Sequence, residues 1–398
     1  MMTSYHRRPY IYPEDAYSLA IIKLGSGSNL LGYYMYHGGT NPTAMMSGNL
    51  DDGSAVYLNE NQRTQATNYN DMPVKTYDFQ APLGEFGQKN PHYFMLRKLH
   101  LFMHDYAEVL APMEASFPCS QDIEKGDDSH LRWSLRSKDK SGFVFINNYE
   151  RLQQLSARKN VQFEVCGVKF PQRPMTVPAG AMCIFPVNID VIRYATAQLI
   201  AKRDGKIYLE QIKGIPTEIA VDGKVLKNVK AKGIAKPVYK NIYLVDSKTA
   251  EHLFLQEEGK SMMLQAPSFK KIKEAESVRK ITMGVQKVAE EPSDADFKKA
   301  AVYQLNLSPE MLQGRNLLKI QYRGDCARLY ADGKLVADNF YNGRPFLMGL
   351  WRLPTDCQKL ELRILPLQKD MPVYFPREAD VTKEGEELVK LEIINDAL

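Results

Sequence analysis

The sequence lacks the long apolar runs and the cysteine motifs that would assign it to several common protein classes. No stretch approaches the roughly 20 apolar residues that a membrane-spanning helix needs, so we expect no membrane span. The five cysteines are widely spaced and form no CxxC pair, which argues against a zinc ribbon and a dense disulfide scaffold. The spacing alone leaves one or two disulfides possible. Most of the cysteines are better interpreted as small buried side chains.

A charge excess of one sign is also missing. The chain has 52 basic and 47 acidic residues, a formal net charge of +5. No basic stripe with interleaved aromatic residues is present, so we expect no nucleic-acid partner. The lysines at 270–273 are broken up by Glu274 and Glu276, a mixture typical of a solvated surface. No apolar segment follows the charged N-terminus, so we expect no signal peptide in this chain. The compartment is left open, with a secreted or periplasmic intact parent as one alternative.

The sequence pattern of the first 110 residues predicts two helices on either side of a buried strand. Pro13 with the two acids after it is typical of a helix start, and Gly25 of a helix end. The apolar run Leu30–Tyr36 predicts a strand buried on both faces of a parallel sheet. A polar loop over 41–75 and a second helix from about Pro91 to Leu110 follow. This order is typical of the end of an α/β barrel, and a doubly wound sheet would produce it too.

From about residue 115 the pattern changes to short alternating strands. Residues 142–146 and 182–187 are clear examples, and Asp-Gly pairs at 204–205, 222–223 and 332–333 lie between strand-like runs. Asp-Gly between such runs is the strongest short signal for a β-hairpin. Repeated short strands with these turns predict β-sandwiches or barrels.

Two segments carry a resemblance to a known family. Tyr34 to Asn41 reads Tyr-Met-Tyr-His-Gly-Gly-Thr-Asn and resembles the Tyr-Met-Phe-x-Gly-Gly-Thr-Asn segment of the family 35 glycoside hydrolases, the β-galactosidases. About 35 residues later, Thr76 to Leu83 resembles that family's Ser-Tyr-Asp-Tyr-Asp-Ala-Pro-Leu, and Gly84 to Gly87 completes it. The strand at 142–148 and the segment from Asp332 to Gly343 resemble parts of the family's β domains.

The resemblance implies a multidomain fold: the C-terminal remnant of a (β/α)₈ TIM barrel, followed by β-sandwich and jelly-roll domains. The limits expected are 1–113 for the barrel end, 114–200 for a β-sandwich, 201–295 for a second β region and 296–398 for a jelly-roll resembling galactose-binding domains. The implied partner is a galactoside or a related glycan, without a cofactor. Self-association into a homo-oligomer is left open.

The same resemblance implies that Tyr34, Tyr77 and Phe79 bind substrate. Barrel enzymes carry their working residues at the C-terminal ends of strands, which fits Tyr34. Phe79 stands where the family usually has a sugar-contacting tyrosine, so one hydroxyl is missing and the sugar is left open. The alternative is that Tyr34 belongs to a barrel core and that Tyr77 is a packing residue.

We expect no catalytic residue in the chain. Retaining glycosidases need two carboxyl groups about 5–5.5 Å apart, which this family takes from its fourth and seventh barrel strands. Leu30–Tyr36 would be the eighth strand, so the sequence is expected to be a fragment or a late start. The nearest acids are interpreted as a helix-start charge (Glu14), a residue orienting loop hydroxyls (Asp78) and a solvated or capping residue (Glu85).

A metal site is not expected either. His100 and His104 have the spacing of a zinc-binding helix, but the glutamate of HExxH and a third ligand are missing. The sequence therefore predicts a carbohydrate-active glycoside hydrolase resembling β-galactosidase, which hydrolyses terminal β-galactosides in its intact form and is inactive as this chain. The alternative is a non-catalytic carbohydrate-binding or interaction module.

Overall fold

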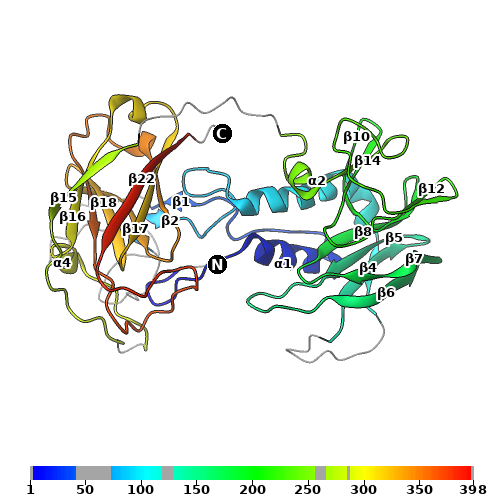
Figure 1. Cartoon of the computed structure of the whole chain (residues 1–398), viewed down its shortest axis with the longest axis horizontal. Coiled ribbons are helices and arrows are strands. Elements are labelled where there is room, and N and C mark those ends of the chain that lie inside the picture. Colours follow the sequence, from blue (N-terminus) through cyan, green and yellow to red (C-terminus); the bar gives the residue numbers. More distant parts are fainter. Residues whose placement is uncertain (1–2, 42–72, 119–128, 256–265, 285–286, 396–398) are drawn as a thin grey trace. The chain divides into compact units, whose positions relative to one another are not determined.

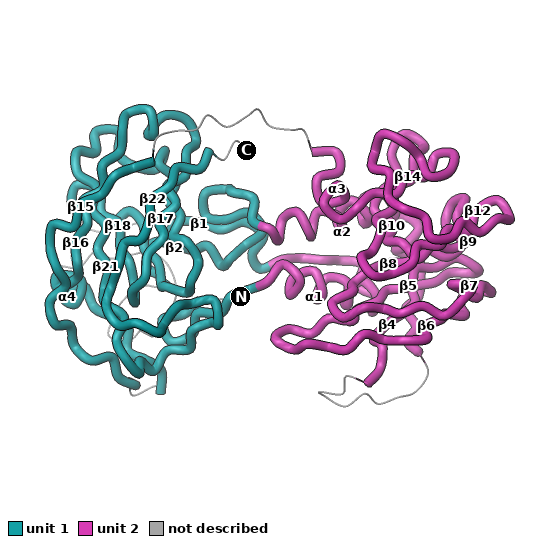
Figure 2. Tube along the Cα trace, viewed as in Figure 1, with its two compact units in different colours: residues 1–11, 34–90, 257–398 teal, residues 12–33, 91–256 magenta. Residues whose placement is uncertain are grey.

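The structure, a computed structural model, describes residues 3–41, 73–118, 129–255, 266–284 and 287–395 and is made mainly of β-sheet (Figure 1). It divides into two compact units (Figure 2): unit 1 comprises residues 1–11, 34–90 and 257–398, and unit 2 comprises 12–33 and 91–256. Each unit combines separate stretches of chain, so the units differ from the four consecutive segments expected above, whose limits stay a prediction. No helix in the described ranges is long and apolar enough to cross a bilayer.

Unit 1 is built on two sheets that share one core. The five-stranded sheet has the order β15–β16–β21–β18–β19, and the three-stranded sheet has the order β20–β17–β22. Side chains from both sheets, including Tyr303, Leu318, Leu329 and Leu362, form a single apolar cluster, as in a β-sandwich. The elements of this unit are β1 (Gly39–Thr40), β2 (Thr76–Tyr77), β15 (Ser268–Lys273), α4 (Asp294–Phe297), β16 (Ala301–Asn306), η1 (Pro309–Leu312), β17 (Asn316–Arg323), β18 (Cys326–Ala331), β19 (Lys334–Phe340), β20 (Phe346–Gly349), η2 (Leu350–Arg352), β21 (Leu360–Ile364) and β22 (Glu387–Asn395).

Unit 2 contains a seven-stranded sheet of order β13–β12–β9–β8–β5–β4–β3, a three-stranded sheet β10–β11–β14 and the hairpin β6–β7. Helix α1 contacts α2, β4 and β5, and α2 also contacts β10 and α3. The elements are α1 (Pro13–Gly25), α2 (Pro91–Leu110), β3 (Glu114–Ser116), β4 (Arg132–Lys138), β5 (Ser141–Asn147), β6 (Arg158–Val165), β7 (Val168–Val177), β8 (Met182–Ile189), β9 (Ile192–Ala195), β10 (Gln198–Arg203), β11 (Lys206–Glu210), β12 (Ile219–Val221), β13 (Lys224–Leu226), β14 (Ile242–Val245) and α3 (Ser247–Glu251).

Both predicted helices are confirmed with the expected ends. The backbone N–H of Tyr12 donates to Asp15 Oδ2 at 3.0 Å at the start of α1. At the other end, a Cβ on Gly25 would lie 2.5 Å from Ser134 Oγ and 2.9 Å from Phe145 Cβ. Glycine at this position therefore lets the end of the helix lie directly on the sheet, a role beyond the helix stop expected from the sequence.

The three Asp-Gly turns are confirmed as hairpins. They join β10 to β11, β12 to β13 and β18 to β19. In the third hairpin Asp332 has φ 47° and Gly333 φ 79°. A two-residue turn with positive φ at both positions matches the twist of the flanking strands, which is why Asp-Gly is favoured there.

The strand predicted over Leu30–Tyr36 is wrong. The run forms no strand, and Leu30 and Tyr34 are 88% and 72% exposed. A parallel strand buried on both faces needs a neighbouring strand along its length. In the described part of the chain this run pairs with no strand, although at its end Tyr36 O accepts the Leu83 N–H at 2.9 Å. The expected end of a TIM barrel is accordingly not seen there. Most of the polar loop predicted over 41–75 lies outside the described residues.

Candidate functional site

Tyr34, Tyr77 and Phe79 come together within unit 1. The ring centroids of Tyr34 and Phe79 are 5.6 Å apart, and those of Tyr77 and Phe79 are 4.6 Å apart. The hydroxyl oxygens of Tyr34 and Tyr77 are 3.1 Å apart, although 43 positions separate the two residues in sequence. We call these three residues the aromatic cluster. Because Tyr34 is 72% exposed, it is not a core residue of this fold.

A short two-stranded sheet joins the two motif segments. β1 pairs antiparallel with β2, with Gly39 opposite Tyr77 and Thr40 opposite Thr76. The segment before Tyr77 is held by Asp338 of β19, which is 3% exposed. Its carboxylate accepts the backbone N–H groups of Val74, Lys75 and Thr76 at 2.6, 2.8 and 3.0 Å. Three charge-assisted hydrogen bonds thus fix this segment to the β-sandwich.

The loop after Tyr77 has an unusual backbone. Phe79 and Gln80 are both left-handed, with φ 55° and 52°, a conformation that costs about 1 kcal/mol or more for each non-glycine residue. Asp78 offsets this cost, because its Oδ2 accepts the Gln80 N–H at 3.1 Å and its Oδ1 accepts the Glu85 N–H at 2.6 Å. The Gln80 side chain also accepts the Ile11 N–H at 3.0 Å. These contacts hold the backbone of the loop that carries Phe79.

Glu85 is buried, 5% exposed, so its interpretation as a solvated or capping residue is wrong. Its Oε1 accepts the Thr40 hydroxyl at 2.5 Å. Burial raises the pKa of Glu85 to about 8, although hydrogen bonds from Thr40 and Thr76 oppose the rise. Burial also raises the pKa of Asp78, against the backbone hydrogen bond from Glu85. The residue that binds loop hydroxyls is therefore Glu85, and not Asp78 as the sequence suggested.

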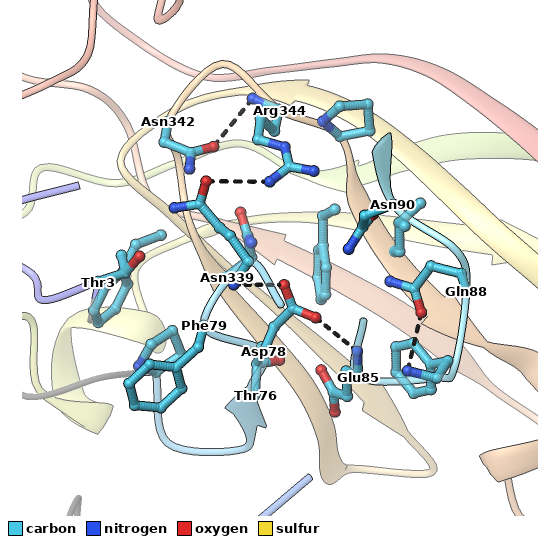
Figure 3. Close-up of a pocket in the computed structure, with 17 residues that line it drawn as sticks. Thr3, Thr76, Asp78, Phe79, Glu85, Gln88, Asn90, Asn339, Asn342 and Arg344 are labelled. Atoms are coloured by element: carbon cyan, nitrogen blue, oxygen red, sulfur yellow. Dashed lines mark hydrogen bonds between the residues drawn. The ribbon is translucent and has the colours of Figure 1, made fainter. Parts of the chain in front are cut away.

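A cavity of about 100 Å³ opens beside Phe79 (Figure 3). We call it the polar pocket, because carboxamide and charged side chains make up much of its wall. They come from the loop after β2, from the end of β19 and from the connection between β19 and β20, and include Asp78, Gln80, Gln88, Asn90, Asn339, Asn342 and Arg344. Sequence reasoning found Asp78 but missed Asn342 and Arg344, although Asn342 lies in a segment that resembles the family.

Arg344 is placed by three contacts, two of which reach residues far away in the sequence. Its Nη1 donates to Gln80 Oε1 at 3.2 Å, and its guanidinium lies 5.3 Å from the ring centroid of Tyr10. The backbone N–H of Arg344 donates to Asn342 Oδ1 at 3.1 Å. Between them, Gly343 has φ 85°, and a Cβ there would collide with the carbonyl of Glu378. The turn thus requires glycine at position 343. The side chains of Asn342 and Arg344 on either side of it line the pocket.

The remaining sequence candidates lie elsewhere. His100 Nε2 is 2.8 Å from the Tyr33 hydroxyl and His104 Nδ1 is 2.7 Å from Asp105 Oδ1, so each histidine has its own partner. No group of three His, Cys, Asp or Glu side chains in the described ranges is arranged to hold a metal ion. Glu14 lies in the first turn of α1, as expected for a favourable helix-start charge. Four cysteines are free thiols, Cys166, Cys183, Cys326 and Cys357, while Cys119 lies outside the described residues.

Comparison with known proteins identifies no family. No protein-family profile matches the sequence, and no curated protein is similar to it. Among solved structures, a rhamnosidase from Novosphingobium sp. PP1Y is 11% identical, with a TM-score of 0.18 over 72% of this chain and 25% of that one. The GH31 alpha-xylosidase Xac1773 from Xanthomonas citri is 10% identical, with a TM-score of 0.11 over 68% of this chain and 37% of that one.

Both neighbours are glycoside hydrolases, and this chain spans only about a quarter and a third of their lengths. TM-scores this low do not establish a shared fold. Neither neighbour therefore supports an activity for this chain, and the functional assignment depends on the two sequence motifs and on the geometry of the site.

Proposed function

We propose that this chain forms the sugar-binding side of a glycoside hydrolase of the family 35 β-galactosidase type, with the aromatic cluster as the contact surface for a terminal β-galactoside. One observation carries the proposal: the three residues assigned to substrate binding from two separate motifs lie together in the fold. Residues that served only for packing would be buried, whereas Tyr34 is largely exposed although it lies against Phe79 and Tyr77.

The cluster has the chemistry that a sugar needs. The rings of Tyr77 and Phe79 are only partly buried and supply apolar surface for the C–H face of a pyranose. The neighbouring hydroxyls of Tyr34 and Tyr77 both donate and accept hydrogen bonds, as the sugar hydroxyls do. Phe79 contributes only its ring, which loosens selection among related sugars at that position.

Hydrolysis through a covalent glycosyl intermediate, with retention of configuration, is the reaction that the family resemblance implies. We assign it to no residue of this chain. Asp78 uses both carboxylate oxygens to hold its own loop, and Glu85 is buried against Thr40. A non-catalytic carbohydrate-binding module is the second candidate, because the described site offers recognition groups and no assigned pair of catalytic carboxylates.

The test is titration of the full chain with methyl β-D-galactopyranoside, by saturation-transfer NMR and calorimetry. We expect the wild type to bind and Tyr34→Ala and Phe79→Ala to weaken binding about tenfold or more, because each removes stacking surface. Phe79→Tyr supplies the hydroxyl usual in the family and should strengthen binding about fivefold, the equivalent of one new hydrogen bond.

Phe254→Ala is the matched control. Phe254 also has a left-handed backbone, with φ 62°, and is 43% exposed, but it belongs to unit 2. Its loss should leave binding unchanged. If the wild type does not bind the galactoside, or if Phe79→Ala binds as tightly as the wild type, the proposed function is wrong.

A further inference from the structure

The polar pocket contains hydrogen-bond donors that the protein itself does not use. Asn342 accepts a backbone N–H through Oδ1, and Gln88 accepts the Phe86 N–H through Oε1 at 3.0 Å. Within the described part of the chain, the amide NH₂ groups of Asn342 and Gln88 and the Nη2 of Arg344 donate to no protein atom. None of these three donors is buried from solvent without a partner, so in the pocket they are open to water or to the acceptor groups of a ligand.

An acceptor faces the same cavity. Each carboxylate oxygen of Asp78 accepts one backbone N–H, which leaves acceptor capacity on both. Asp78 and Arg344 line one pocket, as Figure 3 shows. A hydroxyl group donates to a carboxylate and accepts from an N–H at the same time, so neighbouring hydroxyls match this arrangement. The carboxylate of Asp78 would repel an anion. An apolar group would leave the N–H donors of Asn342, Gln88 and Arg344 without a partner.

The pocket lies directly beside the aromatic cluster. Phe79 lines the pocket and also packs against Tyr34 and Tyr77. Phe86, 5% exposed, adds a second aromatic wall. A volume of about 100 Å³ holds several water-sized groups, enough for the hydroxyl-bearing edge of one sugar ring.

We infer that the polar pocket is a second sugar subsite, which takes neighbouring hydroxyls of a neutral hexose through Asp78, Asn342 and Arg344. The site then binds an oligosaccharide across Phe79: one unit contacts the aromatic cluster and the next enters the pocket. This inference rests on the proposed function and specifies its substrate class, an uncharged oligosaccharide of at least two units.

The test compares affinities of the full chain for methyl β-D-galactopyranoside and β-1,4-galactobiose, measured by calorimetry. For the wild type we expect the disaccharide to bind about tenfold more tightly, since hydrogen bonds to charged groups such as Asp78 and Arg344 are among the strongest available. In Arg344→Met and in Asn342→Asp this ratio should fall to about one. Asn342→Asp keeps the Oδ1 acceptor of the turn, removes the NH₂ donor and adds one negative charge. It therefore tests the pocket even where Arg344→Met disturbs the fold, provided that the charge is controlled for.

Matched controls are available within unit 1. Arg315→Met removes another arginine stacked on an aromatic ring, 4.8 Å from the centroid of Trp351, and Asn306→Asp introduces the same charge at an exposed site on β16. Both should keep the tenfold ratio. The inference is overturned if the wild type binds both sugars equally, if the pocket variants keep the ratio, or if digalacturonate binds more tightly than galactobiose. Failure of the monosaccharide itself to bind would instead contradict the proposed function.

Discussion

At the scale of a single residue, the protein surroundings change the pKa of Glu85. Its ordinary pKa of 4.5 rises to about 8, mainly because burial disfavours the charged form. Between these two values the folded protein keeps a proton that the unfolded chain has lost. Since the folded state binds more protons there, the free energy of unfolding falls as pH rises through this window, and it levels off above the folded-state pKa.

Glu85→Gln should therefore weaken the pH dependence of stability in unit 1. At about pH 5 the variant should resemble the wild type, whereas at about pH 8.5 it should be the more stable protein, because glutamine does not ionise. The measurement is urea unfolding followed by Trp351 fluorescence in a Trp133→Phe background, since the chain has two tryptophans. The exposed Glu274→Gln is the control. If the free energy of unfolding changed with pH in the same way in Glu85→Gln and in the wild type, the pKa of Glu85 would not be raised by folding, and this prediction would be wrong.

At the scale of elements, Arg136 of β4 joins the ends of two helices. It is 1% exposed, and its guanidinium donates to Leu24 O of α1 at 2.9 Å and to Leu110 O of α2 at 3.0 Å. It also donates to Met113 O at 2.9 Å and to Asn29 Oδ1 at 2.8 Å. The last carbonyls of a helix have no partner within the helix, so one planar cation satisfies both helix ends and complements both dipoles.

Arg136→Lys should destabilise unit 2 by about 2–4 kcal/mol, because one ammonium cannot reach four acceptors in different directions and buried carbonyls lose their donors. Guanidinium unfolding measures the loss, and amide hydrogen exchange should rise first in the last turns of α1 and α2. Arg132→Lys on the same strand is the control, since Arg132 forms a partly exposed ion pair with Glu150. Equal effects of the two variants would contradict the role of Arg136.

At the scale of the whole molecule, the candidate site is assembled from distant parts of the sequence. The segment from Tyr34 to Thr40, the loop after β2 and the connection between β19 and β20 all belong to unit 1. The two carboxyl groups in the polar pocket, Asp78 and Glu85, lie on one loop, where Asp78 accepts two backbone N–H groups and Glu85 accepts the Thr40 hydroxyl. A retaining glycosidase needs one ionised carboxylate and one protonated acid on either side of the scissile bond.

We therefore expect the purified chain to show no turnover of 4-nitrophenyl β-D-galactopyranoside, even at a concentration that occupies the aromatic cluster. Release of 4-nitrophenol over several hours is the measurement, with an active β-galactosidase as the positive control. Turnover by the wild type that disappears in Asp78→Asn or Glu85→Gln would make these acids catalytic, and would replace the binding role proposed for this chain.

The sequence by itself determined the features that depend on neighbours along the chain. Pro13 and Gly25 bound a helix, and the Asp-Gly pairs form hairpins, because dihedral preference and capping act over a few residues. The convergence of Tyr34, Tyr77 and Phe79 was predictable only through the resemblance of their motifs. The strand expected over 30–36 failed because a strand exists only with partners, which an apolar pattern does not supply. Arg344 meets Gln80 across 264 positions. Only tertiary packing decided that contact, the polar pocket and the burial of Glu85, since each depends on distant segments meeting in space.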